Sequence, residues 1–600
     1  MNERTKTGLE VLLIAAILGV LGDSLLRVTP WGLNVLLFNA AFAGGTLMML
    51  WRHAPERLTG QTYALLGALV FFASMFVWRD AIELRVADTF TIIAILGVLF
   101  LPTLKISARV AGVFQYGVGV VWAAVNSFLA PFALLASDIG WNDLSTTGSR
   151  KHIFAVFRGL LIVTPLVLIF GALFMAADAV YDGWVRKVLN IDFEILLSHG
   201  LLFALFAWLT AGYFRGIMFG GMAPVVAATL SIIDTATERT AESKVDQFRA
   251  ESGEHPVVLP GNKTVVEHIN SEAETRPVGS VFSDEAETRA AGSVPPESDP
   301  QTPTGTPPSP KTPWSWANID NSIVPGFTFG TVEVSIIMGL MNLLFLSFVI
   351  VQVPYLFGGM DLVQNTPDFK LADYARHGFG ELVAVSALVL PILLASHWLI
   401  RKDSPFTEKL FRVLAGIQIV LLFVIMASAV QRLVLLTGNL GYGLTTVRLY
   451  PMIFMTWLAI VFLWFGVTVL RGARNHFAWG ALWSAFLILG ATHVLNPDEF
   501  IVKTNIALMQ QGRSFDADYN ARLSQDAYPA LMESFDSLNS EQQKFVLMRT
   551  GDRYCEINQN NDLRSWNFSR RRAAVALIAH ETAFEAMGQC DSRGYSYPRY

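Results

Sequence analysis

Long apolar runs dominate the hydrophobic pattern of this chain. Between Leu9 and Leu495, stretches of roughly 17–27 mostly apolar residues recur about a dozen times. Runs such as Leu161–Ala177 and Val447–Leu470 are apolar on every side, whereas a surface helix of a soluble protein keeps a polar face. A helix needs about twenty such residues to cross hydrocarbon, because lipid offers its backbone no hydrogen-bond partner. The pattern predicts an all-α fold, a polytopic transmembrane helical bundle.

The apolar runs define about twelve predicted spans. The first continues through Asp23 and Ser24 without a small-residue cleavage site, so we expect it to be retained and not removed as a signal peptide. The predicted spans are Leu9–Leu26, Trp31–Trp51, Thr62–Trp78, Ala87–Leu104, Val110–Leu135, Ile153–Asp178, Ile195–Phe219, Gly330–Phe357, Phe379–Ile400, Leu410–Leu436, Val447–Leu470 and His476–Leu495.

The chain changes character between Ala236 and Ser322, where Ser, Thr, Pro, Glu and Gly dominate. Pairs such as Pro295-Pro296 preclude regular structure, and so polar a stretch buries too little apolar area to offset its ordering entropy. We therefore predict four parts: an N-terminal bundle of about seven spans (1–235), a disordered linker (236–322), a C-terminal bundle of about five spans (323–495) and a soluble tail (496–600).

The tail has helical patterning in three segments, Phe515–Leu538, Ser540–Arg549 and Ser569–Met587. Asn567 or Ser569 would serve as the N-cap of the last one. We expect a small helical domain packed on one membrane face, with a possible protein partner. Cys555 and Cys590 of this tail are the two cysteines of the whole chain. They either form one disulfide in an oxidising compartment or remain unpaired thiols in the cytosol.

Composition excludes several classes of protein. Apolar residues make up 53% and charged residues 16% of the chain, and its mean hydropathy is +0.44. These values differ from those of a soluble enzyme, so the expected partner of the chain is the lipid bilayer. A net charge of −5 gives no basic footprint for nucleic acid. His580-Glu581 lacks the second histidine of a zinc protease, and no P-loop lysine motif, Rossmann glycine set or Gly-x-Ser-x-Gly elbow occurs where a strand would precede it. No catalytic, cofactor-binding or metal-ligating residue is assigned, and whether the protein is an enzyme stays open.

Ionisable side chains within apolar runs are costly and are functional candidates. Asp23, His199 and Arg432 lie deepest in their predicted spans. They could form a proton or ion relay from acid–base partners, or a few interhelical hydrogen bonds and interfacial contacts, and the second is the favoured interpretation. The full set is Asp23, Arg158, His199, Arg215, Glu333, Glu381, His397, Arg432 and His493.

The segment Gly438–Arg448 contains three glycines, which permit backbone conformations closed to other residues. Thr445 or Thr446 could cap the following helix, which would place Arg448 in its first turn. A cation there opposes the helix dipole, so Arg448 needs an acidic or carbonyl partner, for which Glu381 and Asp373 are the candidates. A tight hairpin with one interfacial salt bridge is as good an interpretation as a ligand site.

Basic residues in the loops give conflicting orientations. Arg401, Lys402, Lys409 and Arg412 share one short loop, which the positive-inside rule places in the cytoplasm. The tail would then lie outside. Basic residues in the N-terminal half, such as Arg4, place the N-terminus inside, and the two assignments agree only for an odd number of spans.

A set of short motifs runs through the chain in this order: Trp78-Arg79-Asp80, Tyr355–Gly359, Ala372–Leu382, Tyr442–Arg448, Asn496-Pro497-Asp498 with Asn505-Ile506, Asp526–Pro529 and Arg564–Asn567. Together they resemble a bacterial membrane family catalogued as domain of unknown function 4173, of which family 4153 is a close sibling. Unlike the expected pattern, His377 stands where a second basic residue belongs. The resemblance implies a multi-span bacterial inner (cytoplasmic) membrane protein with a polar tail and no established activity.

These observations favour a non-enzymatic integral membrane protein acting in transport or in envelope-associated signalling or assembly, with a periplasmic tail. The alternative is a membrane-embedded transferase that uses a lipid-linked donor, for which Asp80 with Glu83, or Asp361 with Asp368, would have to act as convergent carboxylates. The candidate functional polar residues are Arg79, Asp80, Asp373, Arg376, Glu381, Tyr442 and Arg448.

Overall fold

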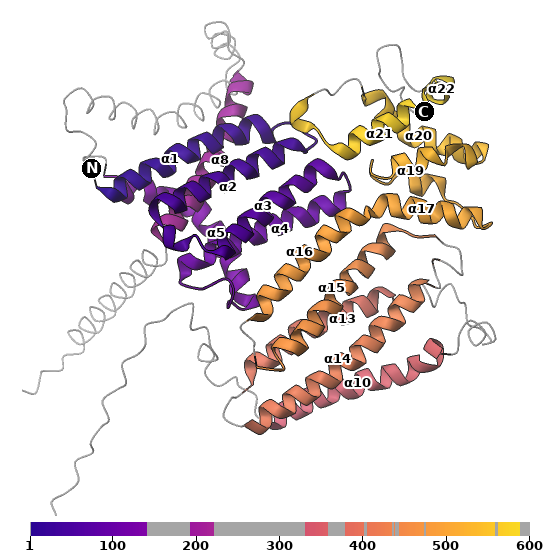
Figure 1. Ribbon diagram of the computed structural model, residues 1–600, viewed down its shortest axis with the longest axis horizontal. Coiled ribbons are helices and arrows are strands. Elements are labelled where there is room, and N and C mark those ends of the chain that lie inside the picture. Colours follow the sequence, from indigo (N-terminus) through magenta and orange to yellow (C-terminus); the bar gives the residue numbers. More distant parts are fainter. Residues whose placement is uncertain are drawn as a thin grey trace, which may run out of the picture. The chain divides into compact units, whose positions relative to one another are not determined.

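The structure, a computed structural model, describes residues 2–140, 193–220, 331–357, 379–400, 405–434, 437, 443–472, 476–557 and 562–588. Regular elements in these ranges are helices (Figure 1), which confirms the predicted all-α fold class. The predicted linker and the span Ile153–Asp178 lie outside the described residues, so both stay predictions.

Ten described helices or helical segments are long and apolar enough to span a membrane, and α13 contains a shorter apolar segment, Leu382–Trp398. This pattern makes the protein a polytopic membrane protein. The helices concerned are α1 (Glu3–Leu21, extended by a π-helical turn Gly22–Leu26), α2 (Leu33–His53), α3 (Gly60–Trp78), α4 (Ile82–Phe100), α5 (Val113–Ala133), α8 (Phe193–Phe219), α10 (Thr331–Phe357), α13 (Phe379–Leu399), α14 (Pro405–Val434), α15 (Thr446–Thr468) and α16 (Phe477–Leu495).

Two apolar cores hold the described membrane helices together. Helices α1–α5 and α8 bury one core, in which Phe42 stacks on Phe214 with ring centroids 5.2 Å apart. Phe486 of α16 joins this core against Phe72 of α3, at 5.3 Å. Helices α10, α13, α14 and α15 bury the second core, around Phe462 and other large side chains. Helix α16 therefore contacts the first core and also packs on α15.

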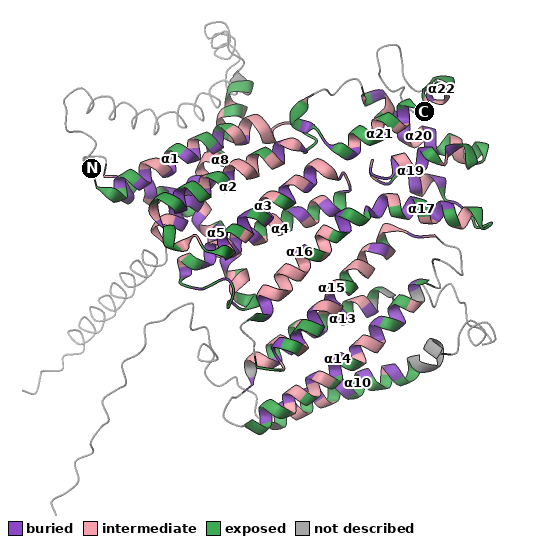
Figure 2. Ribbon diagram, in the orientation of Figure 1, coloured by how far each residue is buried: buried purple, intermediate pink, exposed green. Residues whose placement is uncertain are grey.

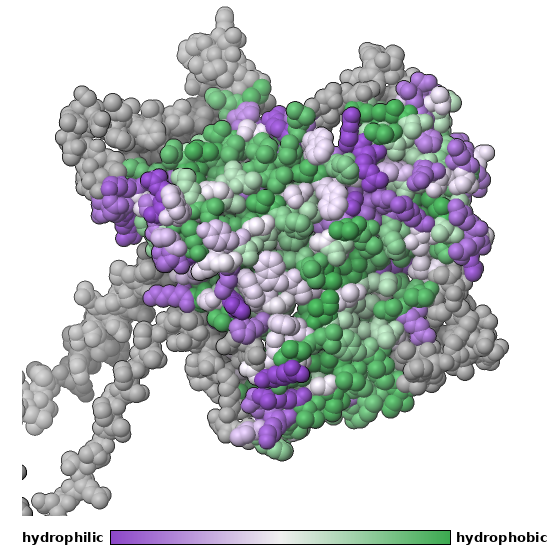
Figure 3. All heavy atoms as spheres, viewed as in Figure 1, coloured by the Kyte–Doolittle hydropathy of each residue, from purple (hydrophilic) through white to green (hydrophobic). Residues whose placement is uncertain are grey.

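The outward faces of these helices carry apolar side chains. Figure 2 shows exposed residues along helix flanks, and Figure 3 shows hydrophobic residues over much of the same surface. Phe90 and Leu487 are 68% and 70% exposed, for example. Contiguous exposed apolar surface of this kind is unfavourable in water and is expected where lipid covers it.

The tail folds into helices around its own apolar core, to which Leu531, Val546 and Leu577 contribute. The segment Phe515–Leu538, whose pattern is helical, forms two short helices and a 3-10 turn and not one continuous helix. Asp516 caps the short α18, and Pro529 at the start of α19 removes a backbone donor, so the segment breaks into separate turns. The tail helices are α17 (Pro497–Gln510), α18 (Ala517–Ala521), α19 (Tyr528–Glu533), α20 (Ser540–Glu556), α21 (Phe568–Ile578) and α22 (Glu581–Ala586).

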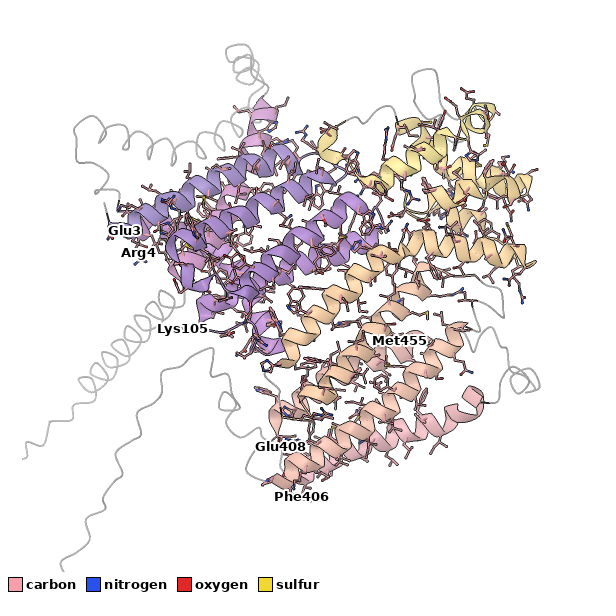
Figure 4. The ribbon with its side chains drawn as sticks, in the orientation of Figure 1. Glu3, Arg4, Lys105, Phe406, Glu408 and Met455 are labelled. Carbon is pink, nitrogen blue, oxygen red and sulfur yellow. The ribbon has the colours of Figure 1, made fainter. Side chains whose placement is uncertain are left out.

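The tail contacts one set of helix ends. Arg564 donates to the Ser24 carbonyl at the end of α1, and the Leu33 N–H at the start of α2 donates to the Trp566 carbonyl. Figure 4 shows Glu3, Arg4 and Lys105 at the other ends of α1 and α4, away from the tail helices. The N-terminus of α1 and the tail therefore lie at opposite ends of the same helix.

Candidate functional site at the junction of tail and membrane helices

Asp526 of the tail binds the turn between α3 and α4. Its Oδ2 accepts hydrogen bonds from the backbone N–H groups of Asp80 and Ala81, at 2.6 and 2.9 Å. Ala81 is the N-cap residue of α4 and has no side-chain acceptor of its own. The buried Asp526 carboxylate supplies that acceptor and places a negative charge at the positive end of the α4 dipole.

Arg79 completes this contact from the membrane side. Its guanidinium lies 3.5 Å from Asp526 Oδ1, and its Nε donates to the His493 carbonyl at the end of α16, at 2.8 Å. The same guanidinium lies over the Trp78 ring, 4.6 Å from its centroid. Arg79 thus joins α3, α16 and the tail, and Ser569 adds a hydroxyl donor to the same Asp526 oxygen. We call this group of residues, Arg79, Asp80, Ala81, Asp526 and Ser569, the Asp526 clamp.

Asn567 provides a second connection between the tail and α3. Its Nδ2 donates to the carbonyls of Phe76 and Arg79, at 2.8 and 2.9 Å, which are C-terminal carbonyls of α3. Its Oδ1 accepts from Arg570 N, so Asn567 is also the N-cap of α21, one of the two capping residues expected from the sequence. One buried amide therefore satisfies the ends of two helices.

The glycine-containing segment before α15 is held by α17 and α18 of the tail. Asn505 accepts from Leu444 N at 2.6 Å and donates back to Leu444 O at 3.0 Å, and Tyr519 accepts from Thr446 N at 2.8 Å. Gly443 has a positive φ of 70°, and a Cβ there would lie 2.8 Å from Asn505 Oδ1. This close approach explains why a glycine stands at position 443.

A buried acid–base pair lies in the membrane helices beside the Asp526 clamp. His493 Nε2 of α16 is 2.9 Å from Asp88 Oδ1 of α4, and both side chains are almost fully buried. Asp88 Oδ2 and His493 Nδ1 have no partner among the residues that the structure describes. The carbonyl of His493 accepts from Arg79, so the pair is directly connected to the clamp.

Asp80 is held between two arginines. Its Oδ1 accepts from Arg85 at 2.8 Å and lies 3.1 Å from Arg570 Nε. Both arginines also donate to the Trp31 carbonyl in the loop between α1 and α2. Burial raises the pKa of the Asp80 carboxyl, against the opposing effect of the two guanidinium groups. Burial also lowers the pKa of Arg570 to about 10.

A cavity of about 610 Å³ adjoins these residues. Asp498 of α17 lines it, with Oδ2 accepting from Ser524 N at 3.0 Å and Oδ1 buried without a partner among the described side chains. Burial raises the pKa of Asp498 to about 6, and the Glu83 charge adds to this. The charged side chains that line the cavity are Asp80, Glu83, Arg85, Asp498, Arg522, Arg549, Arg553 and Arg570.

Two of the candidate polar residues, Arg79 and Asp80, lie at the centre of the junction. Arg448 donates to the Gly443 carbonyl, which is the kind of partner expected for a cation in the first turn of α15. Thr445 is the N-cap residue there but makes no side-chain capping bond. Asp373, Arg376 and Tyr442, and the side chain of Glu381, lie outside the described residues. An ion pair of Arg448 with Glu381 or Asp373 therefore stays a prediction.

Other predicted polar residues find partners within the first bundle. Asp23 pairs with Arg27 at 2.8 Å and with His199 at 2.5 Å, and Arg215 pairs with Asp138 at 2.8 Å. Cys555 is half of a disulfide, whereas Cys590 lies outside the described residues. Among the described residues, no group of three or more His, Cys, Asp or Glu side chains is placed to hold a metal ion.

Four residues of the junction are not among the site residues predicted from the sequence: Asp88, Asn505, Asp526 and Asn567. Asp88 sits at the edge of a predicted span, where an acid is unremarkable. The signal that could have found the others is the resemblance itself, because its motifs at Trp78–Asp80, Tyr442–Arg448, Asn496–Asp498, Asp526–Pro529 and Arg564–Asn567 contain residues that meet at this junction.

No curated protein and no solved structure matches this chain. A family model described as a domain of unknown function (DUF4153) matches residues 66–235 and 295–534, more than half of the chain. The interruption of the match falls in the segment predicted as a linker, and the matched ranges include Arg79, His493 and Asp526. The family that matches is the one expected as the sibling of family 4173. The chain, a polytopic membrane protein, belongs to the DUF4153 family, whose function is unknown.

Proposed function

We propose that this protein is a non-enzymatic membrane protein of envelope-associated signalling or assembly, in which the tail is a recognition domain rigidly coupled to the membrane helices. The observation that supports this best is the Asp526 clamp. A tail residue completes the N-terminus of α4 and binds a guanidinium that also contacts α16. A ligand or partner that shifts the tail would therefore shift helix ends.

The clamp suits coupling because its groups are buried and mutually dependent. Removing one partner of a buried, hydrogen-bonded ion pair leaves the other charge without compensation, which costs about 3–5 kcal/mol. The tail is therefore held in one position by interactions that fail together. The adjoining Asp88–His493 pair extends the buried polar chain into the membrane helices.

The distribution of basic residues supports a periplasmic tail. Arg4, Arg52 and Arg57 lie at the ends of α1 and α2 that are far from the tail, and Lys105 follows the corresponding end of α4. Tyr519 of the tail binds the start of α15, and Arg471 follows the opposite end of this helix. Under the positive-inside rule this face is cytoplasmic. An N-terminus inside and a tail outside, the two assignments that conflicted for about twelve spans, are compatible in this arrangement.

The test is complementation of a strain that lacks the protein. Asp526→Ala breaks the clamp, and Asp536→Ala removes an exposed acid in the same domain as the matched control. We expect Asp526→Ala to insert at the wild-type level and to fail in complementation, as a chain without Asn496–Tyr600 fails. Full complementation by the tail-deleted chain would refute the proposal.

A membrane-embedded transferase is the second candidate, and one observation favours it. Glu83 and Asp498 line the same arginine-containing cavity at the ends of membrane helices. This pair is not one that the sequence predicted. Of the two predicted pairs, Asp80 with Glu83 includes an acid that is engaged by Arg85 and Arg570, and Asp361 with Asp368 lies outside the described residues. Mass spectrometry of lipids after incubation with the purified protein separates the candidates: we expect unchanged lipids, and a new lipid product lost in Glu83→Gln would favour the transferase.

A further inference from the structure

Two kinds of charged group line the cavity of about 610 Å³ beside the Asp526 clamp, which we call the junction cavity. It lies where α4 and α15 begin and where α17, α18 and α20 of the tail face them. Arginines from the tail and carboxylates from the helix starts share its wall. Such a lining is matched to a ligand that carries both an anionic and a cationic group.

The arginines keep donors for an anion. Arg522 and Arg549 both bind Asp518, through Nη2 and Nε respectively, and Arg553 binds Glu556 through Nη1. A guanidinium has five N–H donors, and one carboxylate contact uses only part of them. Three guanidinium groups that line one cavity have the chemistry that binds a phosphate.

The carboxylates that line the cavity include an oxygen atom that is available to accept a hydrogen bond from a cation. Asp498 is only 2% exposed, and its Oδ1 has no partner in the described part of the chain. Glu83 lines the same cavity, whereas Asp80 is neutralised by Arg85 and Arg570. A buried carboxylate oxygen left without a donor is costly, and an ammonium N–H group would satisfy it.

The cavity lies at the level of the lipid headgroups. Two membrane-spanning segments, Ile82–Leu104 and Thr446–Thr468, begin at its wall. Ile82 itself and Val447 beside the cavity residue Thr446 are 64% and 77% exposed, and Trp31, next to Pro30, is 44% exposed. Apolar and aromatic side chains in this position mark the boundary between hydrocarbon and headgroups.

We propose that the junction cavity binds an aminophosphate, a phosphodiester that also carries a primary ammonium group, with a phospholipid headgroup as its source. Arg522, Arg549 and Arg553 bind the phosphate, and Asp498 with Glu83 binds the ammonium. This rests on the proposed function and names the ligand class that the coupled tail recognises. Binding would fill the space between the tail and the starts of α4 and α15.

The experiment measures lipid retention by the purified full-length protein with native mass spectrometry. The probes are phosphatidylethanolamine, phosphatidylcholine, whose quaternary amine has no N–H donor, and phosphatidylglycerol, which has no amine. We expect retention of phosphatidylethanolamine at least about tenfold above the other two, since a charge-assisted hydrogen bond is lost in each. Equal retention of the three lipids would overturn the proposal.

Variants locate the site. Asp498→Asn keeps the side-chain shape and the acceptor for Ser524 N, and Arg553→Gln removes one guanidinium. We expect each to lower retention of phosphatidylethanolamine about tenfold, while Arg513→Gln, an exposed residue after α17, leaves it unchanged. Wild-type retention by both cavity variants would overturn the assignment, and the comparison of lipids on the wild-type protein does not depend on any variant folding.

Soluble glycerophosphoethanolamine distinguishes the source of the aminophosphate. Competition at low concentration would indicate recognition of the headgroup alone, and retention of the lipid without competition would indicate that the acyl chains contribute. Retention of neither compound would overturn the proposal. Complementation by Asp526→Ala tests the coupling separately, because Asp526 does not line the cavity.

Discussion

Asp526 caps α4 from a position 445 residues beyond Ala81, whose N–H it accepts at 2.9 Å. The acceptor that the N-terminus of this membrane helix lacks is therefore supplied by the tail. A helix that begins close to the membrane surface can otherwise satisfy its first N–H groups only with water or lipid headgroups. Folding of the tail and correct termination of a membrane helix are thus linked by one carboxylate.

Asn567→Ala should release the tail from α3. It removes two hydrogen bonds to buried carbonyls as well as the cap of α21, and we expect a loss of about 3 kcal/mol in tail docking. Limited proteolysis of the protein in nanodiscs measures this as faster cleavage of the tail. Asn539→Ala is the matched control, because Asn539 caps α20 without touching a membrane helix, and it should cost about 1 kcal/mol. Equal effects of the two variants would contradict the bridging role of Asn567.

Gly32→Ala should also disturb docking, for a steric reason. A Cβ at Gly32 would lie 2.3 Å from the Trp566 carbonyl oxygen, a backbone atom that cannot rotate away. We expect a destabilisation of about 1–3 kcal/mol and a lower melting temperature in detergent. Gly60→Ala at the start of α3 is the control, because a Cβ there meets nothing within 4 Å. An unchanged melting temperature for Gly32→Ala would show that the tail does not approach this loop so closely.

Loss of the proton from the Asp498 carboxyl should weaken tail docking as the pH rises. Its pKa is raised by burial from 3.8 to about 6, so the folded state binds the proton more tightly than the unfolded state. The contribution of the protonated form is fully present below about pH 4 and is lost as the pH rises through about 6, by up to about 3 kcal/mol.

Asp498→Asn removes this titration. We therefore expect the variant to be more stable than the wild type at pH 7.5 and closer to it in stability at pH 5. The stability of the variant should also change less with pH. Melting temperatures at the two pH values provide the measurement. Asp536→Asn, at an exposed position, should leave the profile unchanged. A wild-type protein that becomes more stable between pH 5 and 7.5 through Asp498 would contradict the assigned direction.

Reporter fusions test the sidedness of the helix ends. An alkaline phosphatase fused after Tyr600 should be active, and one fused at Lys402 inactive, because the tail is proposed to be periplasmic and the basic loop cytoplasmic. Activity at both positions, or at neither, would contradict an arrangement in which the tail and the basic residues lie at opposite helix ends.

Helix positions could be predicted because apolar length is a local property. The runs that end at Trp78 and begin at Val447 appear almost unchanged as α3 and α15. The break of Phe515–Leu538 depends on Asp516 as a cap and on Pro529, whose signals were present but outweighed by the apolar periodicity. Local pattern is therefore reliable for the membrane helices and less so for short tail helices.

The junction could not be predicted from periodicity, because it depends on partners far apart in the sequence. Arg79 meets His493 and Asp526, which lie 414 and 447 residues away. An aspartate in a polar tail carries no local sign that it will cap a membrane helix. Arg570 shows the same limit: it lies among three consecutive arginines of the polar tail, yet its side chain reaches Asp80 and the Pro30 carbonyl and is only 15% exposed.

Hydrogen–deuterium exchange of the full-length protein in nanodiscs tests the coupling of tail and helices most directly. We expect the amides of Asp80 and Ala81, which donate to Asp526, to be protected in the wild type. Asp526→Ala should remove protection both from this turn and from residues 524–530, whereas Asp536→Ala should leave both protected. Unprotected Asp80 and Ala81 in the wild type, or protection that survives in Asp526→Ala, would contradict a docked tail.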